Sequence, residues 1–303
     1  MQVRMAEHLG MCFGVKDAID LALGLARQGP LTILGDLVHN PDVVAAMDAA
    51  GATRVRRLED VRTPAVLLTA HGTADRVKLR LRDEGKEVHD ATCPLVTRVH
   101  LAIRRLVDER RHPVVVGQPN HVEVRGLVGD LDEFTIIQDE SDLDQLRERL
   151  QHDPCARLGV VAQTTQPLER VLQLVEALRR RYPDADVRFL DTVCQPTKDR
   201  QTALRRLAAA ADVVVVVGGP DSNNSRKLVE LAESLDRPAY RVARAAELRP
   251  EWFAGHRVVG LTAGTSTPDD VIAEVREWLE RHEPASVASA SREDYPGPLA
   301  RAD

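Results

Sequence analysis

The sequence predicts an α/β protein built from three pseudo-equivalent units around a common axis. Short aliphatic and β-branched runs alternate with segments of helical periodicity, which is typical of parallel sheets covered by helices. The order cysteine, helix, strand, polar loop, strand, polar loop occurs three times along the chain. Because ligands of open α/β sheets bind beyond the carboxyl ends of the strands, the polar loops of such units would meet at one central place.

The buried strands are predicted from short runs rich in Val, Ile and Leu. They cover residues 31–34, 65–68, 114–116, 213–217 and 258–261. Their nearly uniform apolar character indicates that helices cover both faces of each sheet. The second strand of each unit is expected to end in a polar turn, at residues 69–72, 162–165 and 262–266.

The helices are predicted from apolar residues at helical spacing. Val15, Ile19 and Leu23 form the first stripe, and Gly29 with Pro30 ends that helix. Three further stripes cover residues 96–106, 168–178 and 204–211. Strands that alternate with such helices favour the α/β class.

A weak internal repeat divides the chain. Asp90-Ala91-Thr92-Cys93 is echoed by Asp191-Thr192-Val193-Cys194, and Cys12 stands at the matching place before the first helix. The predicted units are residues 1–92, 93–190 and 191–282, followed by a loose C-terminal tail over 283–303. Cys155 falls outside the repeat and is expected to be an ordinary thiol.

Composition and charge exclude several classes of protein. The chain has 303 residues, 43% hydrophobic and 29% charged, with a formal net charge of −6. Nucleic-acid binding is disfavoured because it needs a basic surface. No run approaches the ~20 apolar residues of a membrane span, and the first residues lack a signal-peptide core. We therefore expect a cytoplasmic protein without nucleic-acid or membrane partners.

The repeated cysteines could ligate a metal centre. A single free cysteine is more often a small buried hydrophobe, but three cysteines in equivalent places make that interpretation less attractive. Structural zinc remains an alternative, although it usually takes four ligands with close pairs and the chain has no C-x-x-C motif. Three cysteines on an iron–sulfur cluster would leave one iron open to a substrate.

Histidines and neutral donors in the polar loops could hold an anion. They include His39, His71, His121, the segment 221–225 and Ser266. Several precede a predicted helix, whose backbone N–H groups would add to the donors. Taken singly, residues such as Ser222, Asn224 and Ser266 are more often helix N-caps than ligands. No Walker loop or G-x-G-x-x-G motif is present, which disfavours nucleotide sites.

Glu123 follows His121 closely and has two interpretations. It could be a solvated loop carboxylate paired with Arg125, or a buried proton donor whose pKa is raised by loss of water. The sequence leaves both open.

Taken together, the motifs are similar to those of one known family. They are Gly10-Met11-Cys12-Phe13-Gly14-Val15, Val38-His39-Asn40, Ala70-His71-Gly72, the stretch 90–97, Gln163-Thr164-Thr165, Cys194, the stretch 222–225 and Thr262-Ala263-Gly264. From about residue 1 to about residue 280, the chain resembles the 4-hydroxy-3-methylbut-2-enyl diphosphate reductase family, also called IspH or LytB.

The resemblance implies a trefoil of α/β units around a [4Fe–4S] cluster with one iron not ligated by protein. It also implies reductive dehydroxylation of an allylic diphosphate to isopentenyl and dimethylallyl diphosphate, the last step of the methylerythritol phosphate isoprenoid pathway. The electron donor would be ferredoxin or flavodoxin.

The resemblance assigns roles to residues by matching position. The cluster ligands would be Cys12, Cys93 and Cys194. The diphosphate would be held by His39, His71, His121, Ser222, Asn223, Asn224 and Ser266. Glu123, with His121 and Thr164, would deliver protons to the departing hydroxyl.

Three positions depart from the family pattern. Asn223 replaces a serine, Arg125 replaces a carboxylate, and Phe13 replaces a small residue. We expect Arg125 to lower the pKa of Glu123 if the two approach, and Phe13 to crowd or dry the cluster. Such changes would suit a divergent paralogue, so a non-catalytic iron–sulfur redox sensor is the alternative function. The retained Glu123 and Thr164 argue against it, since a sensor needs no proton relay.

Overall fold

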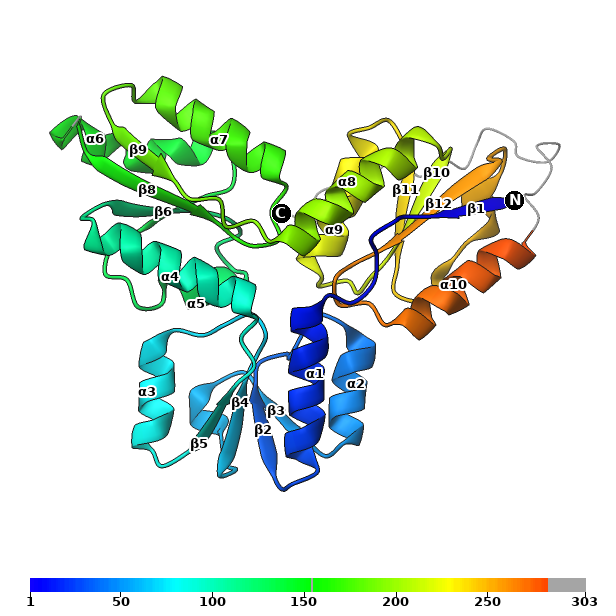
Figure 1. Ribbon diagram of the computed structural model, residues 1–303, viewed down its shortest axis with the longest axis horizontal. Coiled ribbons are helices and arrows are strands. Elements are labelled where there is room, and N and C mark those ends of the chain that lie inside the picture. The colour runs from blue at the N-terminus through cyan, green and yellow to red at the C-terminus, as the bar shows by residue number, and fades with distance from the viewer. Residues whose placement is uncertain (154, 283–303) are drawn as a thin grey trace.

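Three parallel four-stranded sheets form three lobes that meet at the centre of the molecule (Figure 1). The computed structural model describes residues 1–153 and 155–282. Helices pack on the faces of each sheet, so the predicted α/β fold with three similar units is confirmed. The predicted C-terminal tail, residues 283–303, lies outside the described residues.

The first lobe has the strand order β3-β2-β4-β5. Its strands are β2 (Leu31–Leu34), β3 (Thr53–Val55), β4 (Ala65–Leu68) and β5 (Glu87–Asp90). Its helices are α1 (Phe13–Ala26), α2 (Pro41–Ala49) and α3 (Asp75–Asp83), with the short 3₁₀ helix Leu58–Asp60.

The second lobe repeats this arrangement with the order β7-β6-β8-β9. Its strands are β6 (His112–Val116), β7 (Thr135–Ile137), β8 (Arg157–Ala162) and β9 (Asp186–Phe189). Its helices are α4 (Pro94–Asp108), α5 (Val122–Val128), α6 (Arg147–His152) and α7 (Leu168–Arg181), with the 3₁₀ helix Ser141–Leu146.

The third lobe has the order β1-β12-β10-β11. Its strands are β1 (Gln2–Met5), β10 (Val213–Val217), β11 (Ala239–Val242) and β12 (Val258–Ala263). Its helices are α8 (Gln195–Ala209), α9 (Asn223–Glu233) and α10 (Asp269–Arg281), with 3₁₀ helices at Ala245–Glu247 and Pro250–Phe253.

The first strand differs from the predicted division of the chain. Residues 2–5 were expected in the first unit, but Gln2 pairs in parallel with Val258 and Met5 with Leu261 of the third sheet. The chain thus starts in the third lobe and crosses to the first before α1. The boundaries at residues 92 and 190 stay a prediction.

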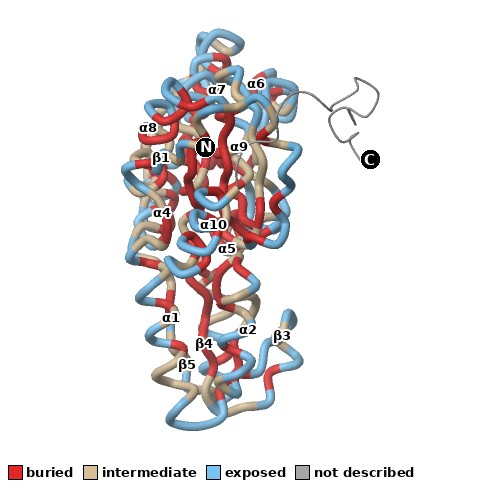
Figure 2. The backbone as a smooth tube through the Cα atoms, turned by 90° about the vertical axis from the view of Figure 1, so that its right-hand side faces the viewer, coloured by how far each residue is buried: buried red, intermediate tan, exposed pale blue. Residues whose placement is uncertain are grey.

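The central strands owe their burial to helices on both faces. All five valines of β10 are buried. Val213, Val215 and Val217 pack into the cluster that contains residues of α10, whereas Val214 and Val216 pack into the cluster formed with α8 and α9. Figure 2 shows buried residues concentrated along strands such as β4, with exposed ones on the outer surface. This explains why the runs are uniformly apolar rather than alternating.

No described helix has both the length and the apolar character that crossing a lipid bilayer requires.

Candidate active site

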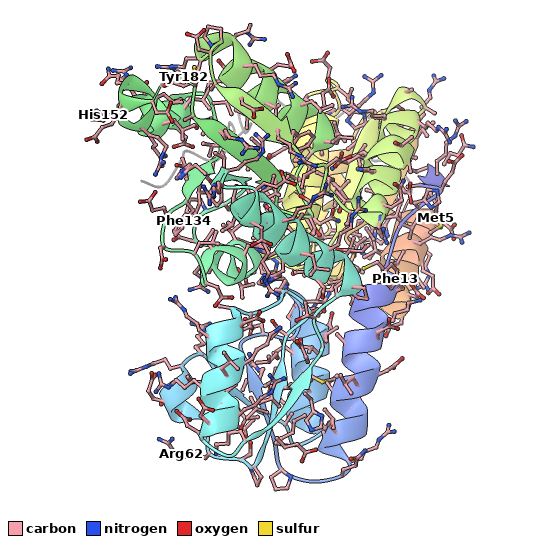
Figure 3. All side chains as sticks on the ribbon, turned by 60° about the vertical axis from the view of Figure 1, so that its left-hand side comes forward. Met5, Phe13, Arg62, Phe134, His152 and Tyr182 are labelled. Carbon is pink, nitrogen blue, oxygen red and sulfur yellow. The ribbon has the colours of Figure 1, made fainter. Side chains whose placement is uncertain are left out.

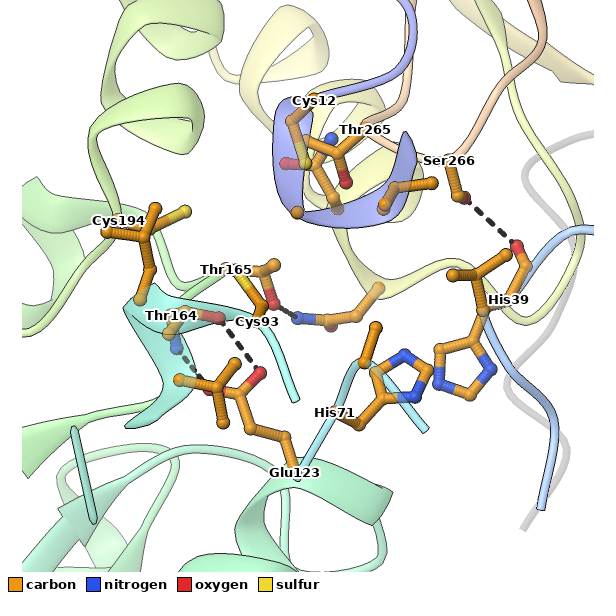
Figure 4. Close-up of a pocket in the computed structure, with 18 of the residues that line it drawn as sticks. Cys12, His39, His71, Cys93, Glu123, Thr164, Thr165, Cys194, Thr265 and Ser266 are labelled. Carbon is orange, nitrogen blue, oxygen red and sulfur yellow. Dashed lines mark hydrogen bonds between the residues drawn. The ribbon is translucent and has the colours of Figure 1, made fainter. Parts of the chain in front are cut away.

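One cavity lies where the three lobes meet, and loops that follow the central strands line it (Figure 4). These are the loops after β2, β4, β6, β8, β10 and β12, two from each sheet. The N-termini of α1, α4 and α8 complete the lining. The carboxyl ends of the central strands therefore converge on one place, as parallel sheets favour.

The cavity contains every site residue that the sequence singled out. The cysteines are Cys12, Cys93 and Cys194, and the other residues are His39, His71, His121, Glu123, Thr164, Ser222, Asn223, Asn224 and Ser266. Their individual roles stay predictions. Cys155, the cysteine outside the repeat, is exposed elsewhere as a free thiol.

The three cysteines occupy the same structural position. Each is the N-cap residue of a helix, namely α1, α4 and α8, and no side chain forms a capping hydrogen bond at these positions. Each cysteine therefore lies at the positive end of a helix dipole, which stabilises negative charge placed there. Burial opposes this and raises the pKa of Cys194 to about 11, and it raises the pKa of Cys93 as well. A metal centre would offset that cost by binding the thiolates.

The donor set fits an iron–sulfur cluster better than a single ion. No group of three His, Cys, Asp or Glu side chains within the described ranges could hold one metal ion. The three thiols nonetheless line one cavity, and a cluster that brings its own iron and sulfide can join thiolates that one ion cannot. Gly14 keeps space open there, since a Cβ on it would lie 2.4 Å from Cys93 Sγ.

Three histidines form a compact group on another part of the cavity wall. The ring centroids of His39 and His71 are 4.3 Å apart, and His121 lies 5.2 Å and 5.8 Å from them. Burial lowers the pKa of all three, that of His121 to about 3. The group is therefore neutral at pH 7, and an anion bound beside it would favour protonation.

Several buried polar atoms of this wall have no hydrogen-bond partner among the described residues. They are His39 Nε2, His71 Nδ1 and Asn224 Nδ2. Buried polar groups in native proteins are nearly always hydrogen-bonded, so unpartnered atoms that line a cavity indicate a place for a polar ligand. His121 adds a directed donor. Its Nδ1 accepts from the backbone N–H of Glu123 at 3.1 Å, which leaves the proton of the neutral ring on Nε2.

Glu123 is a buried carboxyl group, 2% exposed, at the start of α5. Oε1 accepts from the backbone N–H of Thr164 at 2.7 Å, and Oε2 accepts from the Thr164 hydroxyl at 2.9 Å. Burial outweighs these two bonds and raises the pKa of Glu123 to about 7. The interpretation as a solvated loop carboxylate is therefore wrong.

Arg125 does not act as expected. Its side chain is exposed, and it does not contribute to the pKa of Glu123, which is raised rather than lowered. Its charge instead helps to lower the pKa of His121. Residues two positions apart on a helix point to nearly opposite sides, so Glu123 faces the cavity while Arg125 faces solvent.

Phe13 is also placed differently from the expectation. Its side chain is 47% exposed and does not line the cavity. It lies at the first position of α1, as Figure 3 shows, while Gly14 next to it faces Cys93. The expectation that Phe13 crowds or dries the cysteines is therefore wrong, because the helix turns it outward.

The loops of the third lobe hold the remaining polar residues by side-chain bonds. Ser222 caps α9 by accepting from the backbone N–H of Ser225 at 3.3 Å, so its N-cap interpretation is confirmed. Ser266 donates to the carbonyl of His39 at 3.2 Å, which joins the third lobe to the first. Ser266 and Asn224 are not N-caps, since α10 starts after Pro268 and Asn224 lies inside α9.

The sequence named Thr165 only as part of the motif 163–165, without a role, and did not point to Arg226 at all. The Asn223 amide donates to Thr165 Oγ1 at 2.7 Å, and Arg226 donates to Asn223 Oδ1 at 2.8 Å. The orientation of the Asn223 amide is thus set from both sides. One amide hydrogen remains for the cavity. Thr165 was detectable as the neighbour of Thr164, but no local pattern marks Arg226.

The raised pKa of Glu123 predicts a pH-dependent stability. The carboxyl group is protonated in both states below pH 4.5. As pH rises from there to about 7, only the unfolded state releases its proton. The free energy of unfolding therefore falls by on the order of 3 kcal/mol. Glu123→Gln removes this loss. Urea unfolding of the metal-free proteins measures this. Between pH 5 and pH 8, the free energy of unfolding of the variant should increase relative to that of the wild type. A difference that does not change with pH would contradict the assignment.

Comparison with known proteins gives a consistent result. The model of the LytB protein family matches residues 3–280. The 4-hydroxy-3-methylbut-2-enyl diphosphate reductase of Methylibium petroleiphilum is 39% identical over 281 residues, covering 91% of this chain and 84% of the relative. The enzyme of that name from Hahella chejuensis is 36% identical over 300 residues, covering 95% and 93%.

Solved structures agree with these relatives. The E-1-hydroxy-2-methyl-but-2-enyl-4-diphosphate reductase of Plasmodium falciparum has a TM-score of 0.85 at 26% identity, covering 92% of this chain and 87% of that one. A second structure, described as (E)-4-hydroxy-3-methyl-but-2-enyl diphosphate reductase, the terminal enzyme of the non-mevalonate pathway, has a TM-score of 0.65 at 36% identity. It is matched over 99% of its length and 92% of this chain.

Proposed function

The chain belongs to the LytB protein family, and from this premise we propose that it is a 4-hydroxy-3-methylbut-2-enyl diphosphate reductase. The reaction removes the allylic hydroxyl group as water and yields isopentenyl and dimethylallyl diphosphate. It consumes two electrons and two protons, with one proton joining the departing oxygen and the other the carbon skeleton. The proposed place is the last step of the methylerythritol phosphate route to isoprenoids.

The observation that carries the proposal is the composition of one cavity. Its wall combines three cysteines, a neutral histidine group with unpartnered nitrogens, and a carboxyl group that holds a proton near neutral pH. In Figure 4, Cys194 is drawn on one side, His39 on the other, and Glu123 below the space between them. The reaction requires a redox centre, a site that binds the anionic diphosphate, and a source of protons.

Cys12, Cys93 and Cys194 would hold a [4Fe–4S] cluster with one iron not ligated by protein. When bound, such a cluster supplies single electrons and a Lewis-acidic iron, chemistry that side chains lack. The chain's own contribution is to present the three thiolates at helix N-termini from three lobes, beside the space that Gly14 leaves. A small redox protein such as ferredoxin or flavodoxin would be the electron donor.

The histidine group and the start of α9 would anchor the diphosphate. His39 Nε2, His71 Nδ1 and Asn224 Nδ2 are buried and have no partner within residues 1–153 and 155–282, and a diphosphate offers them acceptor oxygens. The remaining anchors would be His121, Ser222, Asn223 and Ser266, which line the same cavity. Backbone N–H groups at the first turn of α9 add positive potential. Because these anchors are neutral, they can bind the diphosphate without a buried cation. Such a cation would need its own counter-charge in the free protein.

Glu123 would supply the proton through Thr164. A pKa of about 7 leaves the carboxyl group close to half protonated at neutral pH, where a general acid works best. The Thr164 hydroxyl lies 2.9 Å from Glu123 Oε2, and Thr164 lines the cavity. When Oε2 carries the proton, it would donate to this hydroxyl, which is then free to direct its own proton into the cavity. The backbone N–H of Glu123 donates to His121 Nδ1, so the ring proton would stay on Nε2, in a residue that lines the cavity.

The test is turnover by the purified full-length protein. Anaerobic reconstitution with iron and sulfide, followed by a strong chemical reductant and 4-hydroxy-3-methylbut-2-enyl diphosphate, should yield both products. Because the two are isomers of equal mass, they are separated by chromatography before detection by mass spectrometry. A protein that binds its cluster and gives no product would instead favour the redox sensor. Cytoplasmic location stays a prediction of the sequence.

Arg226 is expected to support substrate binding through Asn223. Its bond to Asn223 Oδ1 keeps the amide hydrogens turned toward Thr165 and the cavity. Arg226→Gln should raise KM about tenfold with kcat nearly unchanged, since about one charged hydrogen bond is lost. Lys227→Gln is the matched control, because Lys227 also pairs with Glu230 but does not touch Asn223. Equal KM values for the two variants would contradict this role.

A further inference from the structure

Two arginines are buried among the described residues, and their surroundings differ. Arg111 is 9% exposed and its guanidinium donates to the Asp186 carboxylate at 2.8 Å. Glu109 lies 3.5 Å from the same side chain. Arg200 is more deeply buried, at 5% exposed, yet no carboxylate within the described residues forms an ion pair with it. A buried charge without an opposite charge is costly, so this arginine requires a reason.

Arg200 forms two hydrogen bonds, each to a backbone carbonyl oxygen, one in the connection from β1 to α1 and the other in α8. Nη1 donates to the carbonyl of Pro196 at 2.9 Å, and Nη2 donates to the carbonyl of Gly10. Nε is buried, and no residue in the described part of the chain accepts a hydrogen bond from it. Carbonyl dipoles compensate a guanidinium only in part, and one donor is left unsatisfied.

These carbonyls stand next to two of the three cysteines. Gly10 precedes Cys12 in the connection from β1 to α1, and Pro196 follows Cys194 in the first turn of α8. Burial lowers the pKa of Arg200, and Cys12 and Cys194, when they are thiolates, are the first two groups whose charge opposes that shift. The guanidinium therefore joins the two segments that carry these cysteines and lies within their electrostatic reach.

We propose that Arg200 is the counter-charge of the Cys12 and Cys194 thiolates and holds their two segments together in the loaded protein. Arginine stays protonated at every physiological pH, so its charge is permanent. A permanent cation in a low-dielectric region stabilises added negative charge nearby, and reduction of a cluster adds one such charge. Arg200 thereby raises the reduction potential of the bound cluster. This rests on the iron–sulfur cofactor of the proposed function.

Two substitutions separate the effect of the positive charge of Arg200 from the effect of its hydrogen bonds to the two carbonyls. Arg200→Lys keeps the positive charge but replaces the fork that reaches both carbonyls by a single ammonium group. Arg200→Gln removes the charge and keeps an amide donor. Arg206→Gln is the control on the same helix, since Arg206 is exposed and pairs with Glu7 at the surface.

The experiment uses the full-length chain, reconstituted anaerobically with iron and sulfide. Iron and sulfide per chain report cluster content, circular dichroism reports the fold, and a redox titration followed by electron paramagnetic resonance reports the potential. We expect Arg200→Gln to shift the potential to more negative values and to release iron faster to a chelator. Arg200→Lys should keep the wild-type potential with weaker retention, and Arg206→Gln should match the wild type in both.

The outcomes are distinct. A wild-type potential in Arg200→Gln overturns the proposal, and so does loss of the cluster from both Arg200 variants, since lysine retains the charge. Loss from Arg200→Gln alone supports it. Absence of a cluster from the wild type would instead defeat the proposed function. A wild type that binds a cluster whose potential depends on Arg200, but that shows no turnover, would leave this inference standing.

Discussion

Glu123→Gln should lower turnover by 100-fold or more, on the order of 10²–10⁴ for the loss of a general acid. The substitution preserves size, and the amide oxygen can still accept from the Thr164 backbone, as Oε1 does at 2.7 Å. What disappears is the proton that a carboxyl group with a pKa of about 7 carries at neutral pH. Because the change lies outside the three cysteines, iron and sulfide per chain should stay at the wild-type level.

The pH profile makes this prediction specific. A general acid must be protonated, so kcat of the wild type should fall as pH rises through the pKa near 7. The residual kcat of Glu123→Gln should not show this fall as pH rises. Glu169→Gln is a suitable control, because Glu169 is an exposed partner of Arg205. Undiminished turnover of the Glu123 variant would remove this residue from the mechanism.

Cys194→Ala should abolish stable cluster binding, which would be the largest effect of a single substitution on cofactor content. A cluster with three protein ligands would be left with two, and the charge that Arg200 compensates would be halved. The metal-free fold should persist, since Cys194 contributes one side-chain bond, to Thr197 at 3.0 Å. Iron and sulfide analysis with visible absorption measures the effect.

Cys155→Ser is the control for this prediction. Cys155 is exposed and outside the cavity, so cluster content should not change. If iron is lost from Cys155→Ser and retained by Cys194→Ala, the assigned set of ligands is incorrect. A broad visible absorption that disappears only on substitution of Cys12, Cys93 or Cys194 would also exclude the zinc alternative.

The pattern of apolar residues predicted the central strands and missed the edge strands. The runs at 31–34, 65–68 and 213–217 coincide with β2, β4 and β10, and each is buried on both faces. Edge strands such as β3 and β5 carry exposed polar residues and have no uniform pattern. Strand β1 shows the same limit, because nothing within Gln2–Met5 indicates that its partner is β12 at the other end of the chain.

The sequence by itself determined which residues follow the central strands, and therefore which side chains meet in the cavity. Strand-to-loop order is a local property, and parallel sheets bring all the carboxyl ends to one edge. Cysteines, histidines and Glu123 could be selected on that basis.

Only the tertiary structure decided how these groups behave. The pKa of Glu123 near 7, the neutral histidine group and the unpaired charge of Arg200 depend on neighbours that are far away in the sequence. The packing of distant segments decides which side chains lose contact with water. The free-energy cost of a buried charge then depends on whether an opposite charge lies close to it. A linear pattern carries neither quantity.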